Sequence, residues 1–385
     1  MHDQPEGRPQ TRCQGYTHPV FAEVREAFDS NLRTGDELGG SVAVYRHGRL
    51  VVDLWGGARD SGGTPYPDDA LHVAYSVTKG VMGLVLASLI ESSHVDLGVP
   101  VAEYWPDFAS CGKADVLVGE LASHQAGLPG FTQPITVAEL ADWELCTRRL
   151  AAQEVAWPPG SAHGYHALTL GYLVGEVMRR ATGRTVGQLL RERFDASELQ
   201  AWIGLPSELG GRVVSAIEAP PTPGLGSVVQ QASTTVGTMT HAAFSNPALT
   251  AATFNDPATW SSEIPAANGV FDARSLARLY SSAVDGPLRS LREVTVEQVR
   301  RPRADGPDLV LVDQPTRFGA AFMTYCTRQP MLGPGSFGHD GLGGHLAFAH
   351  PESGIAFAYL TNRAVSDPGP HSRVWRLLAA VSAAI

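Results

Sequence analysis

A regular pattern of apolar residues begins near position 19 of the chain. Residues 19–35 carry apolar side chains at helical spacing, which predicts an amphipathic helix. Two glycines then precede segments typical of strands, so 41–45 and 49–55 are predicted to form a hairpin around a turn at 46–48. We therefore expect the fold to open with a helix followed by two paired strands.

A second strand pair is predicted near the other end of the chain. Residues 344–350 and 355–361 are rich in apolar and aromatic side chains and flank a turn at 351–354. Helical spacing returns at about 371–384. Because strands occur at both ends of the chain, we expect the two ends to build one sheet.

The middle of the chain has a mainly helical pattern. Four segments show helical periodicity: 81–93, 137–152, 167–181 and 185–194. The pattern predicts an α+β protein in which residues 1–80 and 266–385 form an antiparallel sheet flanked by helices. Residues 81–265 would form a mainly helical inserted domain, with the active site in the cleft between the two.

Two stretches lack a clear periodicity. Residues 219–265 are rich in Pro, Ala, Thr, Ser and Asn, and long segments of this kind in compact proteins often serve function. Together with 302–334, this stretch is predicted to line the binding cleft and to set the choice of substrate.

The composition is that of an acidic globular protein. The chain has 385 residues, 43% of them hydrophobic, which is enough to bury a substantial core. Its formal net charge of -10 argues against a general nucleic-acid role, because phosphate binding needs a basic face. The short basic run 300–303 is expected to be a solvated loop.

The sequence also favours a cytoplasmic location without membrane attachment. Residues 1–12 lack the apolar core of a secretory signal, and the longest apolar stretch, 81–90, is too short to span a membrane. The cysteines are scattered without Cys-x-x-Cys spacing, at Cys13, Cys111, Cys146 and Cys326. A reduced protein with free thiols is predicted, and a surface disulfide is the alternative.

Lysine is rare in this chain, and its positions are informative. Of 29 lysines and arginines together, only Lys79 and Lys113 are lysines. Arginine does not lose its proton in a protein, whereas a desolvated lysine does and then serves as a base. Both lysines follow a serine by three residues, in the segments 76–79 and 110–113, so spacing alone does not choose between them.

The context favours Ser76 and Lys79. Apolar residues follow at 81, 82, 85, 86, 89 and 90, the spacing of a buried helix, which places the serine and the lysine one turn apart on the same face. Near a helix N-terminus, N–H groups and the helix dipole favour a serine nucleophile, and a lysine in a dry pocket accepts its proton. Lys113 lies in a predicted turn and is expected to be an ordinary exposed lysine.

Two further segments present candidate groups. The turn-rich loop 157–167 delivers Tyr165 just before a predicted helix, although a lone tyrosine is also a common core residue. The glycine-dense segment 335–344 lets a substrate approach the backbone, and the N–H of Leu342 is predicted to hold an oxyanion together with that of Ser76. A hairpin bulge is the alternative for this segment.

In this order, the segments resemble the signatures of the serine β-lactamase and penicillin-binding protein superfamily, in particular its class C-like members. Ser76 and Lys79 match Ser-x-x-Lys, Tyr165 matches the tyrosine element, and residues 339–341 stand where a Lys-Thr-Gly triplet is expected. Segments 121–128 and 157–160 extend the resemblance over nearly the whole chain. It implies a β-lactamase/transpeptidase-like fold.

Two residues depart from the penicillin-type pattern. Ala167 stands in place of the asparagine of Tyr-x-Asn, and His339 in place of the lysine of Lys-Thr-Gly. A histidine is mostly neutral at pH 7 and anchors a carboxylate poorly. With these departures the chain resembles the family VIII carboxylesterases and related acyltransferases most closely.

That resemblance implies roles for the site residues. Tyr165 would be the general base and acid, with its pKa lowered by Lys79, and the Leu342 N–H would lie in the oxyanion hole. The substrate-binding residues would be His339, Asp340, Gly341 and Ala167. Whether Lys79 or Tyr165 takes the serine proton stays open, because the two titrations are coupled.

Other classes of protein fit the sequence less well. An α/β-hydrolase needs a Gly-x-Ser-x-Gly elbow, which this chain lacks, and a dinucleotide-binding fold needs a βαβ unit that the pattern does not supply. The scattered histidines include no His-Glu-x-x-His, so no metal is predicted. A binding protein with a dead site would have no need of Ser76, Lys79 and Tyr165 together.

The predicted function is that of a serine hydrolase, a carboxylesterase acting through an acyl-enzyme on Ser76. Its partner would be a small-molecule ester with a small or medium acyl group, and no cofactor is expected. An acyltransferase that moves the acyl group to an alcohol or amine of a natural product is the main alternative. β-Lactamase or D-amino-acid peptidase activity is a lesser one, and the sequence makes no prediction of the oligomeric state.

Overall fold

The fold is organised around one antiparallel sheet to which both ends of the chain contribute. A computed structural model of the chain describes residues 13–194, 197–218, 226–329, 331–364 and 372–385. The nine strands follow the order β1 (Gln14–Thr17), β3 (Arg49–Gly57), β2 (Gly39–Arg46), β13 (Ile355–Thr361), β12 (His345–His350), β11 (Phe337–Gly341), β10 (Met323–Thr324), β9 (Pro315–Phe318) and β8 (Ala304–Pro307). Both predicted hairpins are confirmed, and they meet where β2 pairs with β13.

Side chains of different size alternate along the central strands and decide which helices cover each face. In β13, Phe357 and Tyr359 point toward α1 (Ala22–Thr34) and α14 (Ser372–Ala383), whose apolar faces join the same cluster of buried residues. The intervening Ala356 and Ala358 face the other side. Because alanine is small, helices on that side approach the sheet closely.

The helices on the alanine side are α2 (Val77–Glu91) and α12 (Ala273–Ser281). Helix α2 is apolar around its whole circumference and nearly all of it is buried, as expected for a helix in the centre of a protein. It lies against β11 and β12 on one side and against the helices of the middle of the chain on the other. The start of α2 therefore lies between the sheet and the helical part of the chain.

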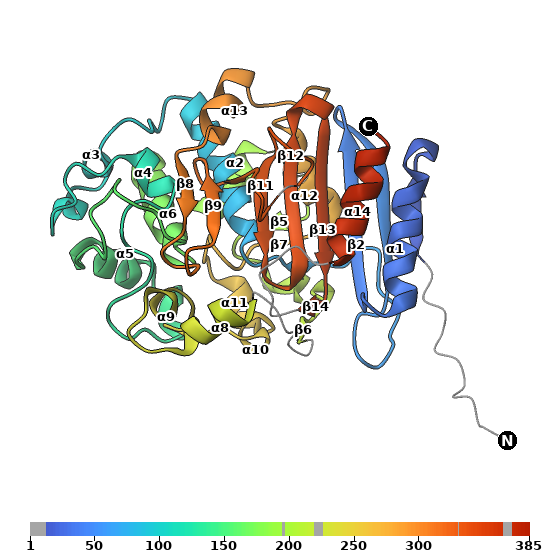
Figure 1. The fold of residues 1–385 in the computed structure, drawn as a ribbon, viewed down its shortest axis with the longest axis horizontal. Coiled ribbons are helices and arrows are strands. Elements are labelled where there is room, and N and C mark those ends of the chain that lie inside the picture. The colour runs from blue at the N-terminus through green and yellow to red at the C-terminus, as the bar shows by residue number, and fades with distance from the viewer. Residues whose placement is uncertain (1–12, 195–196, 219–225, 330, 365–371) are drawn as a thin grey trace.

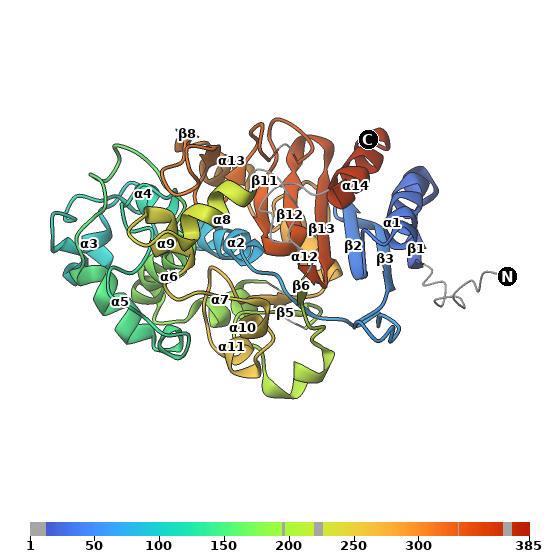
Figure 2. The same cartoon turned by 60° about the horizontal axis from the view of Figure 1, so that its bottom comes forward.

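The middle of the chain is mainly helical. Its longer helices are α5 (Trp143–Ala152), α6 (Thr169–Thr182) and α7 (Val186–Arg193), and shorter ones are α3 (Val101–Tyr104) and α4 (Val118–Ala122). Figures 1 and 2 show α3 to α6 at the left of both views, away from α1 and α14, which lie side by side. These helices confirm the predicted segments 137–152, 167–181 and 185–194, whereas the domain boundaries at 80 and 265 remain a prediction.

The stretch 219–265 contains more regular structure than its pattern indicated. Four short helices occur here: α8 (Gly226–Thr234), α9 (Met239–Phe244), α10 (Ala251–Phe254) and α11 (Pro257–Ser261). The side chains of Thr238, Thr250 and Asp256 cap the last three, so local capping rather than a long apolar stripe defines them. Residues 219–225 of this stretch lie outside the described residues.

The remaining elements complete the frame. Helix α13 (Glu293–Arg300) precedes β8, and a small sheet joins β4 (His72–Val73), β7 (Val270–Phe271) and β5 (Ala201–Trp202). A parallel pair joins β14 (Arg363–Ala364) to β6 (Ile217–Glu218). No helix in the described part of the chain is long and apolar enough to cross a membrane, and the four cysteines are free thiols.

Candidate active site

Ser76 is presented at the N-terminal end of α2. It is the N-cap residue of the helix, and Tyr75 before it has a positive φ of 48° that turns the chain sharply into the helix. The turn is fixed by a hydrogen bond from the Val77 N–H to the Ala74 carbonyl at 3.1 Å. Ser76 is half-buried, whereas its neighbours Tyr75 and Val77 are buried. Of these three residues, Ser76 is therefore the one that solvent or a substrate can reach.

Lys79 lies one turn further along α2, directly beneath Ser76. Its Nζ is 3.2 Å from the Ser76 Oγ, and it donates hydrogen bonds to the carbonyls of Ala167 at 2.6 Å and Ala266 at 2.9 Å. A neutral lysine amine has two hydrogens and one lone pair. When both hydrogens are donated to the two carbonyls, the lone pair is left for the Ser76 hydroxyl.

Burial shifts the Lys79 amine toward its neutral form. The side chain is fully buried, and desolvation lowers its pKa to about 7, although the nearby Asp340 carboxylate acts in the opposite direction. A large share of the molecules therefore carry an unprotonated Lys79 at neutral pH. The dry pocket that the sequence required for a lysine base is present.

Tyr165 lies on the same site, but its ionisation differs from the prediction. The Lys79 Nζ is 4.8 Å from the centre of the Tyr165 ring, and the Ser76 side chain acts to lower the Tyr165 pKa. The expected lowering of its pKa by Lys79 is wrong, because burial dominates and raises the pKa of Tyr165 above its ordinary value. Tyr165 is therefore a protonated phenol at neutral pH and not a base at rest.

His339 and Asp340 lie at the end of β11 next to these groups. Burial lowers the pKa of His339 to about 3, so the ring is neutral. Its Nδ1–H donates to the Asp340 carbonyl at 2.6 Å, which leaves Nε2 as an acceptor; this atom is buried and has no hydrogen-bond partner among the described residues. Burial raises the pKa of Asp340, and the charges of Arg328 and Lys79 oppose that shift.

Gly341 lets the end of β11 approach the Ser76 turn. A Cβ atom at this position would lie 2.5 Å from the Ala74 carbonyl oxygen and 3.2 Å from a methyl group of Val77. Only glycine permits this contact. Leu342 follows in a short 3₁₀ turn (Leu342–Gly344), so its backbone comes next to the turn that carries Ser76.

Ala167 contacts the candidate catalytic lysine through its backbone, and its role in substrate binding stays a prediction. Its side chain is buried, and its carbonyl binds Lys79. Sequence reasoning missed Ala266, the second acceptor, because a backbone carbonyl has no signature in the sequence. It also missed Asp308, a buried carboxylate that accepts from the Tyr165 N–H at 3.0 Å and thereby fixes the tyrosine loop.

His124 supports the same loop. Its Nδ1 accepts a hydrogen bond from the His166 N–H at 2.9 Å, and its carbonyl accepts from the Gly164 N–H at 3.1 Å. Both donors flank Tyr165. His124 therefore orients the tyrosine loop from the helical side.

The second Ser-x-x-Lys segment is remote from this chemistry, but Lys113 is not the exposed lysine that was expected. The side chain is buried, its Nζ donates to the Gln153 carbonyl at 2.7 Å, and it lies over the ring of Phe108. Ser110 bonds the Ala151 carbonyl instead of the lysine. Packing against α5 buries this turn, which a local pattern does not predict.

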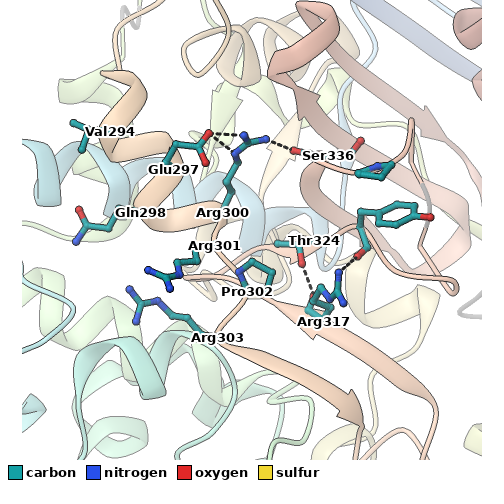
Figure 3. Close-up of a pocket in the computed structure, with 13 residues that line it drawn as sticks. Val294, Glu297, Gln298, Arg300, Arg301, Pro302, Arg303, Arg317, Thr324 and Ser336 are labelled. Carbon is teal, nitrogen blue, oxygen red and sulfur yellow. Dashed lines mark hydrogen bonds and ion pairs between the residues drawn. The ribbon is translucent and has the colours of Figure 1, made fainter.

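A pocket rich in arginine lies apart from Ser76. It is bordered by α13 and by residues of β9 and β10, and its lining includes Arg300, Arg301, Arg303 and Arg317 (Figure 3). None of the candidate catalytic residues lines it. The basic run 300–303 is only partly the solvated loop that was expected, since Arg300 pairs with Glu352 and donates to the Gly335 carbonyl.

Two other expectations can be compared with the structure. Among the described residues, no group of three or more His, Cys, Asp or Glu is placed to hold a metal ion. The other expectation is that the chain has no dinucleotide-binding fold. Gly333, Gly335 and Gly338 have the spacing Gly-x-Gly-x-x-Gly, but this segment leads into the antiparallel strand β11, whereas a dinucleotide-binding turn leads into a helix.

Comparison with known proteins identifies the family. The model of the family described as Beta-lactamase matches residues 24–382. The chain belongs to the beta-lactamase family. Among curated members, the esterase/beta-lactamase LipL of Mycobacterium tuberculosis is 35% identical over 382 residues, which cover 95% of this chain and 86% of LipL.

Solved structures of beta-lactamase relatives share the whole fold. A family VIII carboxylesterase superposes with a TM-score of 0.88 at 32% identity, covering 97% of this chain and 100% of its own. A penicillin-binding protein homolog from Caulobacter crescentus has a TM-score of 0.85 at 36% identity, again covering 97% and 100%. The β-lactamase/transpeptidase-like fold predicted from the sequence is confirmed.

Proposed function

We propose that the protein is a serine carboxylesterase that forms an acyl-enzyme on Ser76. The observation that carries this proposal is the position of the Lys79 Nζ, which lies 3.2 Å from the Ser76 Oγ and donates to two carbonyls. In a neutral amine these two bonds use both hydrogens, so the lone pair is available to the serine hydroxyl. The names of the relatives, an esterase/beta-lactamase and a family VIII carboxylesterase, support an ester as the substrate.

In the proposed acylation, Lys79 takes the proton from the Ser76 Oγ while that oxygen attacks the ester carbonyl carbon. The carbonyl oxygen becomes an oxyanion, and we assign its stabilisation to the N–H groups of Ser76 and Leu342. At the start of α2, the first N–H that donates within the turn is that of Val77, which bonds the Ala74 carbonyl. The Ser76 N–H precedes it and is not used by these turn hydrogen bonds. The N-terminal end of α2 adds a favourable dipole.

Acylation is completed when the alcohol leaves, and its oxygen then needs an acid. Tyr165, protonated because burial raises its pKa, would donate its proton to the departing alkoxide and recover it from Lys79. In the second half-reaction water attacks the acyl carbonyl carbon and gives a proton to Lys79. The bond from the acyl carbon to the Ser76 Oγ then breaks, this oxygen takes the proton from Lys79, and the carboxylic acid leaves. In this proposal Lys79 is the base and Tyr165 relays the proton to the leaving group.

The choice of substrate follows from the altered third signature. The neutral His339 offers an acceptor and no positive charge where penicillin-type enzymes carry a lysine. We therefore propose uncharged esters over substrates with a carboxylate. Transfer of the acyl group to a small-molecule alcohol or amine shares the first half-reaction and is the second candidate function.

A cytoplasmic location, consistent with the free cysteines, also stays a proposal.

A panel of p-nitrophenyl esters of increasing acyl length, assayed with and without an added alcohol, tests the proposal. We expect hydrolysis of short and medium esters, loss of activity in Ser76→Ala, and wild-type activity in the matched control Ser110→Ala, whose hydroxyl bonds the carbonyls of Asp107 and Ala151 away from the site. A Ser76→Ala variant with wild-type turnover would contradict the proposal. Ester products that appear with the added alcohol would favour the transferase alternative.

A further inference from the structure

The turn that carries Leu342 is held from the far side of the sheet by a buried arginine. Arg373, at the start of α14, donates from Nη2 to the Gly343 carbonyl at 2.8 Å. Gly343 and its successor Gly344 have positive φ values of 87° and 94°, so this turn depends on glycine geometry. The residue whose N–H we assign to the oxyanion hole directly precedes this anchored carbonyl.

Arg373 is itself held rigidly. It is only 2% exposed, and its Nη1 donates to the Glu37 carboxylate at 3.3 Å and to the Thr361 hydroxyl at 3.2 Å. Its Nη2 also reaches the Arg363 carbonyl at 3.3 Å. A planar guanidinium with this many acceptors has one orientation, which a flexible lysine does not reproduce.

Glu37 completes the support. The carboxylate is 3% exposed and accepts hydrogen bonds from the Thr361 hydroxyl at 2.7 Å and from the hydroxyl of Tyr359. Both of these residues belong to β13, an inner strand of the sheet that pairs with β2 and β12. Arg373 is thus tied to an inner strand as well as to the Gly343 carbonyl.

Leu342 therefore lies between two fixed points. On one side Gly341 contacts the Ala74 carbonyl of the Ser76 turn, and on the other Arg373 binds the Gly343 carbonyl. A buried ion pair is a poor device for stability alone, because apolar residues of similar size often stabilise a protein as well or better. Here one member of the pair also anchors the backbone next to the reacting atoms.

We propose that Arg373 is a positioning residue of the candidate oxyanion hole, and that by holding the Gly343 carbonyl it fixes the turn that presents the Leu342 N–H to the substrate. This inference rests on the proposed function, since it assumes an oxyanion at Ser76. Arg373 would act through backbone geometry and never touch the substrate.

The test compares variants that break the link to Gly343 with variants that keep it. Arg373→Lys retains the positive charge beside Glu37 but loses the planar guanidinium that binds Glu37 and the Gly343 carbonyl at the same time. The double variant Glu37→Gln/Arg373→Met removes both charges and leaves no unpaired buried ion. Glu37→Gln and Thr361→Val are the matched controls. Glutamine still offers an acceptor to the Arg373 Nη1, and valine removes one of its several acceptors, so the Nη2 bonds to the Gly343 and Arg363 carbonyls keep the guanidinium in place.

We expect kcat for p-nitrophenyl butyrate to fall roughly 10- to 100-fold in Arg373→Lys and in the double variant, with KM changed by less than about threefold. The affinity for an alkyl boronic acid, which adds to the serine as a tetrahedral anion, should fall in parallel with kcat. Both controls should keep kcat within about threefold of wild type. Activities are compared well below the Tm of each variant, so that loss of folded protein does not enter.

The outcomes separate this inference from the proposed function. If the wild-type chain is not acylated on Ser76, the proposed function itself fails. If wild type is acylated and either broken-link variant folds and keeps wild-type kcat and boronic acid affinity, only the role of Arg373 is refuted. Equal losses in the controls and in Arg373→Lys would likewise overturn it, because they would show that the loss of kcat does not depend on the bond from Arg373 to the Gly343 carbonyl.

Discussion

Replacing Lys79 with arginine separates its charge from its ability to accept a proton. The structure assigns Lys79 a pKa of about 7, so about half of the molecules hold a neutral amine at pH 7. Arginine, with a pKa above about 12, is neutral in fewer than roughly one molecule in 10⁵ at this pH. Lys79→Arg thus keeps a cation under Ser76 and removes the base.

The size of the effect follows from what a general base contributes. General-base catalysis supplies roughly 10²- to 10⁴-fold in rate, so we expect kcat/KM of Lys79→Arg for a p-nitrophenyl short-chain ester to fall by that factor. The assay is the initial rate of p-nitrophenol release, with circular dichroism to confirm that the variant is folded. An arginine variant with kcat/KM within tenfold of wild type would refute proton transfer to Lys79.

Lys113→Arg is the matched control, as it makes the same exchange at the other lysine of the chain. Because Lys113 is buried and donates to the Gln153 carbonyl, the larger guanidinium should lower the Tm. Its kcat/KM should stay within about twofold of wild type, since this lysine lies in another part of the molecule. A loss of activity equal to that of Lys79→Arg would show that the effect is not specific to the Ser76 site.

Three further outcomes are expected. The pH profile of kcat/KM should rise with pH through a midpoint near 7, because the neutral form of Lys79 is the active one. Asp340→Asn should move this midpoint to lower pH, because the Asp340 carboxylate raises the Lys79 pKa. An unchanged or higher midpoint in Asp340→Asn would contradict this. Gly341→Ala should lower kcat/KM at least about tenfold, because its Cβ would lie 2.5 Å from the Ala74 carbonyl, whereas Gly98→Ala, near an exposed turn, should be silent. Nitrocefin, a cephalosporin with a carboxylate, should be turned over at least about tenfold less efficiently than a p-nitrophenyl ester, because His339 is neutral; equal kcat/KM values would refute that reasoning.

The sequence was most informative where local patterns carry the structure. The alternating strands near both termini and the apolar run after Ser76 predicted the sheet and α2 correctly, although α2 begins at Val77, four residues before the predicted start at 81. The helical spacing also placed Ser76 and Lys79 on one face, and their side-chain atoms lie 3.2 Å apart. The alternation of each strand, the apolar run of α2 and the spacing of Ser76 and Lys79 all depend on residues that are close together in the sequence.

The sequence was less informative where distant segments meet. Ala266 accepts a hydrogen bond from Lys79 although 187 residues separate them, and any residue type offers the same carbonyl. The raised pKa of Tyr165 and the burial of Lys113 likewise result from tertiary packing, which their local sequences do not encode. The bond from Arg373 to the Gly343 carbonyl joins α14 to the turn after β11 and has no signature in the local sequence.

The most direct test of the account is mass spectrometry of the intact protein after brief incubation with p-nitrophenyl butyrate and acid quenching, followed by peptide mapping. The account predicts one butyryl group per wild-type molecule, located on Ser76, and none on the Ser76→Ala variant. A wild-type protein that hydrolyses the ester but carries its acyl group on another residue, or a Ser76→Ala variant that still becomes acylated, would contradict it.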